Sequence, residues 1–229
     1  MFGTIVNTLA IAAGSLLGLL LKGGIPKRYM ETVMQSVGLA VILIGLKGAL
    51  KSDELLLVII SLAVGSVMGE MIDIEARLEQ LGQWLEKRFS RSGGGIAKGF
   101  VAASLLFCVG SMAIVGSMES GLTGNHQTLF AKSVLDGVAS VIFASSLGIG
   151  VIFSAASVFI YQGFITLLAA VIKPFLIPAV VGQMSAVGGI LIMAIGINIL
   201  EIRKIKVGNM LPAIFIPLMY YMLQVLMKF

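Results

Sequence analysis

Two ionisable side chains in an otherwise apolar stretch, Lys132 and Asp136, are the residues best placed to do chemistry. They lie four positions apart, so on a helix they share one face and can pair. Carboxylates within membrane spans are costly and usually face protein or a water-filled path. We therefore predict that Asp136 is a functional group, such as a proton or cation site. For Asp136 the alternative is an acid at a helix N-terminus, stabilised by free backbone amides. For Lys132 the alternative is an interfacial anchor, which is the simpler interpretation of that residue.

A glycine- and serine-rich segment, "VGSMAIVGSMESG", precedes this pair at 109–121. Gly110 with Ser111 and Gly116 with Ser117 stand six residues apart, which does not place them on one helix face. Broken helices are tolerated in a membrane where protein or water satisfies the freed backbone groups. The segment therefore predicts a discontinuous helix that lines a polar cavity, against the alternative of an ordinary, tightly packed helix.

Three further polar residues complete the candidate substrate- or ion-binding set. Glu119 ends the glycine-rich segment, and Asn7 lies in the first apolar run, where hydrogen bonding between helices would also explain it. Glu70 ends the third apolar run beside Asp73, either as a solvated interfacial acid or as part of a cytoplasmic gate. His126 is expected to be a solvated loop residue, and no metal is assigned to it.

The composition identifies the kind of protein that must position these groups. Of 229 residues, 58% are hydrophobic and 12% are charged, whereas soluble domains carry about 25% charged residues. The sequence therefore predicts an all-α, polytopic transmembrane helical bundle in a lipid bilayer. The net charge of +5 does not indicate nucleic-acid binding, because the basic residues stand between apolar spans and report topology.

Apolar segments of spanning length recur along the whole chain, which predicts about seven to eight spans in a single transmembrane domain, 1–229. The stretch 133–172 is too long for one span, and "SSLGIG" at 145–150 is where a break is easiest. Eight spans with both termini outside leave eleven of the 16 Lys and Arg residues inside. The segments are 4–21, 33–50, 54–72, 100–117, 133–152, 154–172, 184–202 and 209–227.

Between the third and fourth segments, the spacing of apolar residues at 74–89 predicts an amphipathic helix. With Trp84 at the headgroup level it would lie on the cytoplasmic membrane surface, although packing on other protein explains the pattern nearly as well. The residues 90–95, "SRSGGG", are expected to form a flexible linker.

Glycines four apart, as in "GSLLG" and "GSVMG", predict close helix packing in the first and third spans. A weak internal repeat is also visible. It pairs the segment at Gly38 with that at Gly189, and the segment at Gly3 with that at Gly137. The two offsets differ by seventeen residues, so the second pairing would need an insertion.

The sequence contains no phosphate-binding loop, nucleophile elbow, zinc-protease motif or His/Cys metal pair. We therefore expect no enzymatic activity and no cofactor.

At "FCVGSMAIVGSMESGL", "KSVLDGVASVIFASSLGIGV" and "VGNMLPA", the sequence resembles the YqgA/YdfK-type family of bacterial inner-membrane proteins, a domain of unknown function. "GTIVNTLAIAAGSLLG" and "GEMIDIEARLE" extend the resemblance over nearly the whole chain. It implies a bacterial cytoplasmic membrane location and no established substrate. The residues that carry the motif include most of the candidate set together with Asn209.

Together these features predict a transporter or channel for a small solute or ion of unknown identity, and a homo-oligomer. The competing hypothesis is a membrane scaffold or sensor that binds partners through its GxxxG helix faces and the Trp84 helix.

Overall fold

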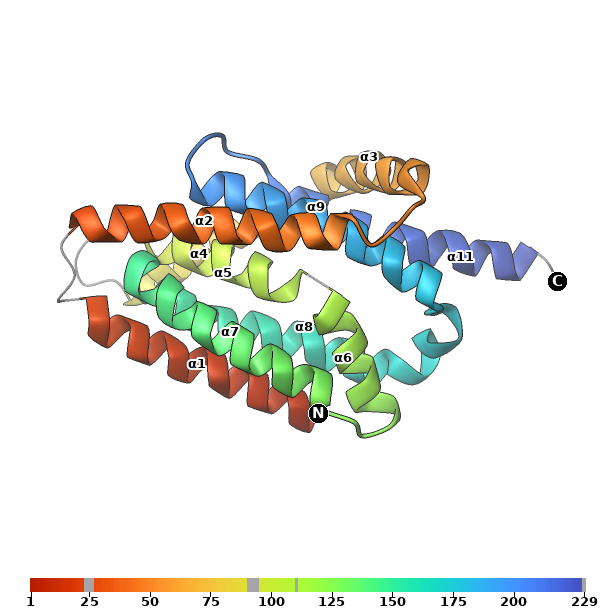
Figure 1. Ribbon diagram of the computed structural model, residues 1–229, viewed down its shortest axis with the longest axis horizontal. Coiled ribbons are helices and arrows are strands. Elements are labelled where there is room, and N and C mark those ends of the chain that lie inside the picture. The colour runs from red at the N-terminus through yellow and green to blue at the C-terminus, as the bar shows by residue number, and fades with distance from the viewer. Residues whose placement is uncertain (23–26, 90–94, 110, 228–229) are drawn as a thin grey trace. The chain divides into compact units, whose positions relative to one another are not determined.

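The computed structural model describes residues 1–22, 27–89, 95–109 and 111–227, and every regular element within those ranges is helical. Figure 1 labels the helices. The helices of the first half are α1 (Phe2–Lys22), α2 (Lys27–Ala49), α3 (Leu55–Ile72), α4 (Ile74–Phe89), α5 (Ile96–Cys108) and α6 (Ser111–Leu122). Those of the second half are α7 (Gln127–Leu147), α8 (Gly150–Ile172), η1 (Lys173–Phe175), α9 (Pro178–Ile199), α10 (Val207–Met210), η2 (Leu211–Phe215) and α11 (Ile216–Met227).

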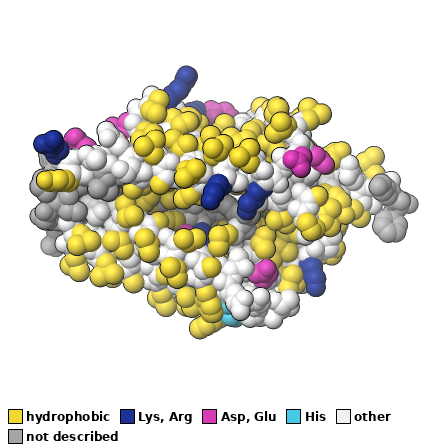
Figure 2. All heavy atoms as spheres, in the orientation of Figure 1, with side chains coloured by type: hydrophobic (Ala, Val, Ile, Leu, Met, Phe, Trp, Pro, Cys, Tyr) yellow, Lys and Arg dark blue, Asp and Glu magenta, His cyan; other side chains and the backbone are white. Residues whose placement is uncertain are grey.

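Six stretches of the described chain are long and apolar enough to cross a membrane: α1, α3, α7, α8, α9 and the run from α10 to α11. The bent pair α5 and α6 forms a seventh candidate, and α2 contains a shorter apolar stretch, Gln35–Ala49. Apolar side chains accordingly cover much of the face shown in Figure 2. The chain is thus a helical membrane bundle, as expected.

The helices group into two compact units that are interleaved along the sequence. Unit 1 comprises residues 1–37, 76–108 and 112–170, and unit 2 comprises 38–75, 109–111 and 171–229. Neither unit is a continuous stretch of chain, so each is assembled from helices that are far apart in the sequence.

In unit 1, α1 packs along α7 in the same direction (Figure 1). A Cβ atom added at Gly14 would overlap the backbone carbonyl of Gly137, and one at Gly18 would overlap the carbonyl of Val141. The two backbones therefore touch where the glycines lie, and the predicted packing role of the "GSLLG" motif is confirmed.

The pair α5 and α6 runs alongside both α7 and α8. Ser104 donates to the hydroxyl of Ser157 at 3.0 Å, and Gly121 lies against the backbone of Thr166, so the pair is parallel to α8. Gly99 of α5 approaches Leu147, the last residue of α7. Helix α7 thus lies against both α1 and the pair α5 and α6, and that pair also lies against α8.

Both predicted breaks occur, one of them displaced. The helix stops at Leu147, Gly148 takes φ 85°, a conformation that favours glycine, and α8 begins at Gly150. The glycine-rich segment bends by 60° between α5 and α6. However, α6 is continuous through Gly116 and Ser117. The break therefore lies before Ser111, and the segment is helical from Ser111 onward.

In unit 2, α3 packs against the chain around η2 in the opposite direction. Gly65 approaches Ala213 and Gly69 approaches the backbone of Asn209. The apolar part of α2 packs on α9, also antiparallel, where Gly45 and Gly189 bring the two backbones together. The "GSVMG" motif thus serves close packing, as predicted.

The weak repeat corresponds to helices that pack on each other, α1 with α7 and α2 with α9. The first pair is parallel and the second is antiparallel. One duplication without an insertion would give both pairs the same sense. The two senses therefore need the inserted span that the offsets also need, and α8 lies at that place in the chain.

The helix expected at 74–89 forms with those bounds as α4. Gly82 packs on Ala97, and Leu85 joins a core with Ile96 and Phe100. Trp84 remains 58% exposed, so α4 packs on protein through one face and presents an aromatic side chain on another. Of the expected linker 90–95, residues 90–94 lie outside the described ranges.

Candidate functional site

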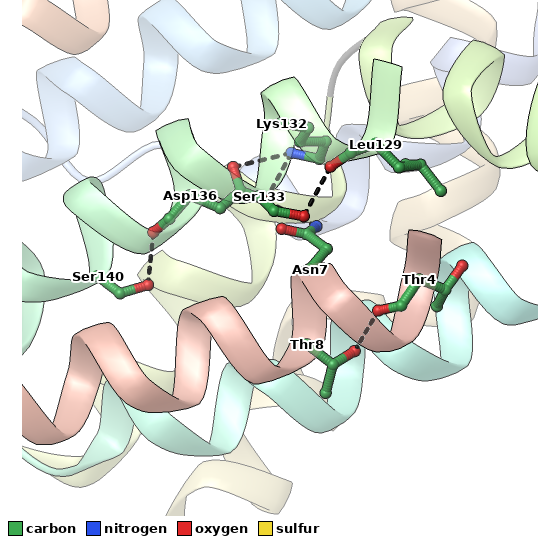
Figure 3. Close-up of polar contacts among 8 residues, drawn as sticks. All are labelled: Thr4, Asn7, Thr8, Leu129, Lys132, Ser133, Asp136 and Ser140. Atoms are coloured by element: carbon green, nitrogen blue, oxygen red, sulfur yellow. Dashed lines mark hydrogen bonds and ion pairs between the residues drawn. The ribbon is translucent and has the colours of Figure 1, made fainter. Parts of the chain in front are cut away.

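Lys132 and Asp136 form a buried ion pair on α7, joined by a side chain from α1. The Lys132 ammonium nitrogen lies 2.9 Å from Oδ1 and 2.8 Å from Oδ2 of Asp136. Asn7 donates through Nδ2 to Oδ2 of the same carboxylate at 3.0 Å. Figure 3 shows Asn7 pointing from α1 toward this part of α7. The predicted pairing is present, and Asn7 makes the interhelical hydrogen bond expected of it.

The pair lies well inside the helix, which corrects two sequence-based interpretations. Helix α7 begins at Gln127, so Asp136 is its tenth residue of 21, about 14 Å along the axis. It is therefore not an N-terminal acid stabilised by free backbone amides. Lys132, at 7% exposure, is not an interfacial anchor. The sequence misplaced both because the polar first turn of α7 does not look like part of a span.

Polar side chains continue along one face of α7 at intervals of four residues: Thr128, Lys132, Asp136 and Ser140. Glu119 of α6 joins this file near the start of the helix, because Thr128 donates to its Oε2 at 2.6 Å. This row of polar side chains therefore runs from the first turn of α7 past the middle of the helix. The hydroxyl of Ser140 donates to the Asp136 carbonyl, so it is satisfied within the helix.

Other polar atoms in unit 1 are buried without a partner in the described chain. Oδ1 of Asn7, both side-chain amide atoms of Gln162 and the hydroxyls of Thr4 and Ser117 belong to this group, and all four residues are 0% exposed. Buried polar groups are normally hydrogen-bonded, and an unsatisfied one costs about 1–3 kcal/mol. Four such residues from α1, α6 and α8 indicate an interior built to receive water or a polar solute.

Gln162 and Ser117 each lie one turn before a contact between α8 and α6. That contact joins Thr166 of α8 to Gly121 of α6, and the two segments run in the same sense. Gly116, next to Ser117, contacts the side chains of Thr128 and Leu129 on α7. The α6 segment at Gly116 therefore lies within about one turn of Lys132.

Sequence reasoning missed Gln162 and Thr4. The signal that could have found Gln162 is an amide in the uncharged run "VFIYQGFITLL" of α8, since neutral polar residues in spans hydrogen-bond across helices. Thr4 gave no such signal, because threonine often bonds to its own helix backbone.

The remaining members of the predicted set divide as follows. Gly116 serves packing, and Ser117 belongs to the unpartnered group. Gly110 and the side chain of Ser111 lie outside what the structure describes. His126 directly precedes α7, and its Nδ1 lies 3.0 Å from the hydroxyl of Ser120, so it is not simply solvated.

Glu70 belongs to unit 2 and to a separate polar cluster. Its two oxygens accept from Lys206 and from Nδ2 of Asn209, each at 2.6 Å. The Asn209 oxygen accepts from the backbone N–H of Glu75, whose carboxylate accepts from the Gly208 N–H, again at 2.6 Å. Asn209 therefore closes the α3–α4 corner onto the start of α10. The hydrogen bond to Glu70 raises the pKa of Lys206 above its usual value.

Within the described ranges, no three His, Cys, Asp or Glu side chains come together in a way that could hold a metal ion. The chemistry available to the unit 1 cluster is that of a charge pair and amide and hydroxyl groups.

Comparisons with known proteins give a family. Residues 2–222 match the family described as "Protein of unknown function (DUF554)". The chain is 38% identical over 221 residues to "Uncharacterized membrane protein YdfK" of Bacillus subtilis (strain 168), covering 95% of this chain and 94% of that protein. It is 33% identical over 219 residues to "Uncharacterized protein YqgA" of Escherichia coli (strain K12), with 93% and 92% covered. No solved structure matches. The chain is a multi-pass membrane protein that belongs to the DUF554 family.

Proposed function

We propose that this protein is a transporter of a small polar solute, bound in unit 1 at the Lys132, Asp136 and Asn7 cluster. The observation that carries the proposal is a charge pair buried mid-helix within the same unit as unpartnered polar atoms from three other helices. A purely structural core gains little from such groups, because apolar replacements of a buried ion pair are often neutral or stabilising. Groups that cost stability are retained where they serve binding.

The packing directions support a topology in which the chain crosses the membrane eight times. Alternating crossings that include α2 and the bent pair α5 and α6 make α1 parallel to α7 and α5–α6 parallel to α8. The same eight crossings make α3 antiparallel to the chain from α10 to α11, and α2 antiparallel to α9. All four relations are observed. If α2 did not cross, α1 and α7 would be antiparallel, which is not the case. Both termini then lie on one side, which the distribution of Lys and Arg makes the outside.

The scaffold hypothesis loses one of its two supports, the glycine faces, and keeps the exposed Trp84 of α4. The glycine pairs that could have formed docking faces, Gly14 with Gly18 and Gly65 with Gly69, are occupied by helices of the same chain. They are not available to a partner protein in the structure described. Transport therefore accounts for more of the buried features than partner binding does.

The test is a flux screen on purified protein in proteoliposomes, with a panel of labelled ions, amino acids and neutral solutes. We expect uptake of at least one solute, and a reduction of at least tenfold per folded, reconstituted molecule in Asp136→Asn. The matched control is Glu70→Gln, which neutralises a carboxylate outside unit 1 and should leave uptake close to wild type. Absence of flux for every solute, with folded protein, would contradict the proposal.

A further inference from the structure

We infer that the solute is a small zwitterion that carries an ammonium and a carboxylate on the same carbon, as α-amino acids do. This inference rests on the proposed transport function and names the substrate class of that same site. In the bound state, the ammonium of the solute pairs with Asp136 and its carboxylate pairs with Lys132.

The first argument is charge. In α1, α5, α6, α7 and α8, the charged residues apart from Lys132 and Asp136 are Lys22, Lys98 and Glu119, each in the first or last turn of its helix or one residue from it. The deep part of these helices therefore carries one positive and one negative charge. A cation or an anion bound there would leave a net charge at membrane depth, which is costly. A zwitterion leaves the site neutral both before and after binding.

The second argument is that each member of the pair already has the partner that the solute would replace. Lys132 lies within 2.9 Å of both Asp136 oxygens, so without a solute the two charges neutralise each other. When a zwitterion enters, one ion pair is exchanged for two of the same kind. A solute with only one charge would satisfy one side chain and leave the other as an unpaired buried charge, the strongly unfavourable case.

The third argument is the supply of hydrogen-bonding groups. An ammonium brings three donors, and a carboxylate brings only acceptors. Oδ1 of Asn7 is an unpartnered acceptor, and Nδ2 of the same amide donates to Asp136. Oδ1 therefore lies where an ammonium bound to Asp136 would need a second acceptor. The unpartnered Nε2 of Gln162, in the same unit as Lys132, is a donor for the carboxylate.

Charge balance also gives the expected energetics of the cycle. Because the empty and loaded sites are both neutral, movement of either across the membrane transfers no charge. Uptake of a zwitterion should then be unaffected by membrane potential, whereas uptake of a lone cation would respond to it.

The experiment measures counterflow into proteoliposomes of glycine, L-alanine and L-serine beside single-charge and uncharged relatives. The relatives are methylamine, acetate, propionate and glycerol. We expect at least one amino acid to exchange at least tenfold faster than every relative, at a rate unchanged by a potassium diffusion potential. Flux of a relative without flux of any amino acid would overturn the zwitterion inference and leave the transport proposal standing. No flux of any of these probes would overturn the zwitterion inference, and absence of flux for the wider panel of ions and solutes as well would overturn both.

The variants separate binding from folding. Lys132→Met with Asp136→Leu removes both charges and leaves no buried charge unpaired, so the double variant should fold. Its amino-acid exchange should fall at least a hundredfold. Retained exchange would overturn the inference. If this variant does not fold, Lys132→Asp with Asp136→Lys keeps one charge of each sign. The exchanged pair should still favour zwitterions over the single-charge relatives, and loss of that preference in folded protein would overturn the inference.

Discussion

Units 1 and 2 are packed by the same device and differ in how they treat polar groups. In both, glycines let helix backbones touch, as at Gly14 in unit 1 and Gly69 in unit 2. Yet all seven buried side-chain atoms that lack a partner in the described chain belong to unit 1, the five named above and the hydroxyls of Ser15 and Ser146. In unit 2 the buried polar side chains, such as Asn209 and Gln183, are bonded to named partners.

This difference indicates a division of labour. A closed hydrogen-bond network rigidifies the elements that it joins, whereas unsatisfied groups are a cost that a fixed framework would not keep. Unit 2 has the character of a framework, and unit 1 has the character of a binding region. Four experiments test this contrast, and they follow in order of expected effect.

The largest effect should come from the glycines, and it should be equal in the two units. Gly14→Leu and Gly69→Leu each drive a side chain into a neighbouring backbone, so both variants should yield almost no folded protein in detergent by size-exclusion chromatography. The control is Gly163→Ala, because a Cβ there meets only the terminal methyl of Met1, at 3.4 Å. A folded, monodisperse Gly14→Leu protein would show that the helices are not in contact.

Asn209→Ala should strongly destabilise unit 2 without reducing transport. It removes the acceptor of the buried Glu75 N–H, which costs about 2–3 kcal/mol. Thermal unfolding should shift down by several degrees, while solute affinity measured below the transition stays at the wild-type value. A selective loss of affinity would mean that unit 2 contributes to the site.

The two buried glutamines give the sharpest contrast. Gln162→Met replaces two unpartnered polar atoms by apolar ones, so stability should stay the same or rise by up to about 1 kcal/mol, while exchange falls at least tenfold. Gln183→Met breaks the bond to Glu54, 2.9 Å long, and should lower stability by about 1 kcal/mol with exchange intact. The same pattern in both variants would remove the distinction between the units.

The smallest effect should come from Lys206→Met. The side chains of Lys206 and Glu70 are 57% and 55% exposed, and exposed ion pairs contribute little. The pKa of Lys206 is raised in the folded protein, so any contribution is fully present below its unfolded pKa and is lost only as the pH rises through the folded value. Melting temperatures between pH 6 and 8 should therefore match wild type, and a marked difference would make this pair structural.

The sequence was informative where a local rule decides the structure. The bounds of α4 followed from apolar periodicity, the break at Gly148 from span length, and the Lys132 and Asp136 pair from helical spacing. The depth of the pair did not follow, because hydropathy placed the start of the span six residues too late. The grouping of Asn7 with Asp136, and of Glu70 with Asn209, depends on which distant helices meet, and no local pattern encodes that.

The placement of both charges of the pair on a single helix has a consequence for biogenesis. A salt bridge between residues four apart closes as soon as that helix coils, before any other span has docked. Helix α7 can therefore leave the translocon as an electrically neutral segment, although a lone Asp or Lys at its centre would oppose insertion by about 2.5–3.5 kcal/mol. Substitution of only one of the two should accordingly impair insertion of the nascent chain, whereas substitution of both should not.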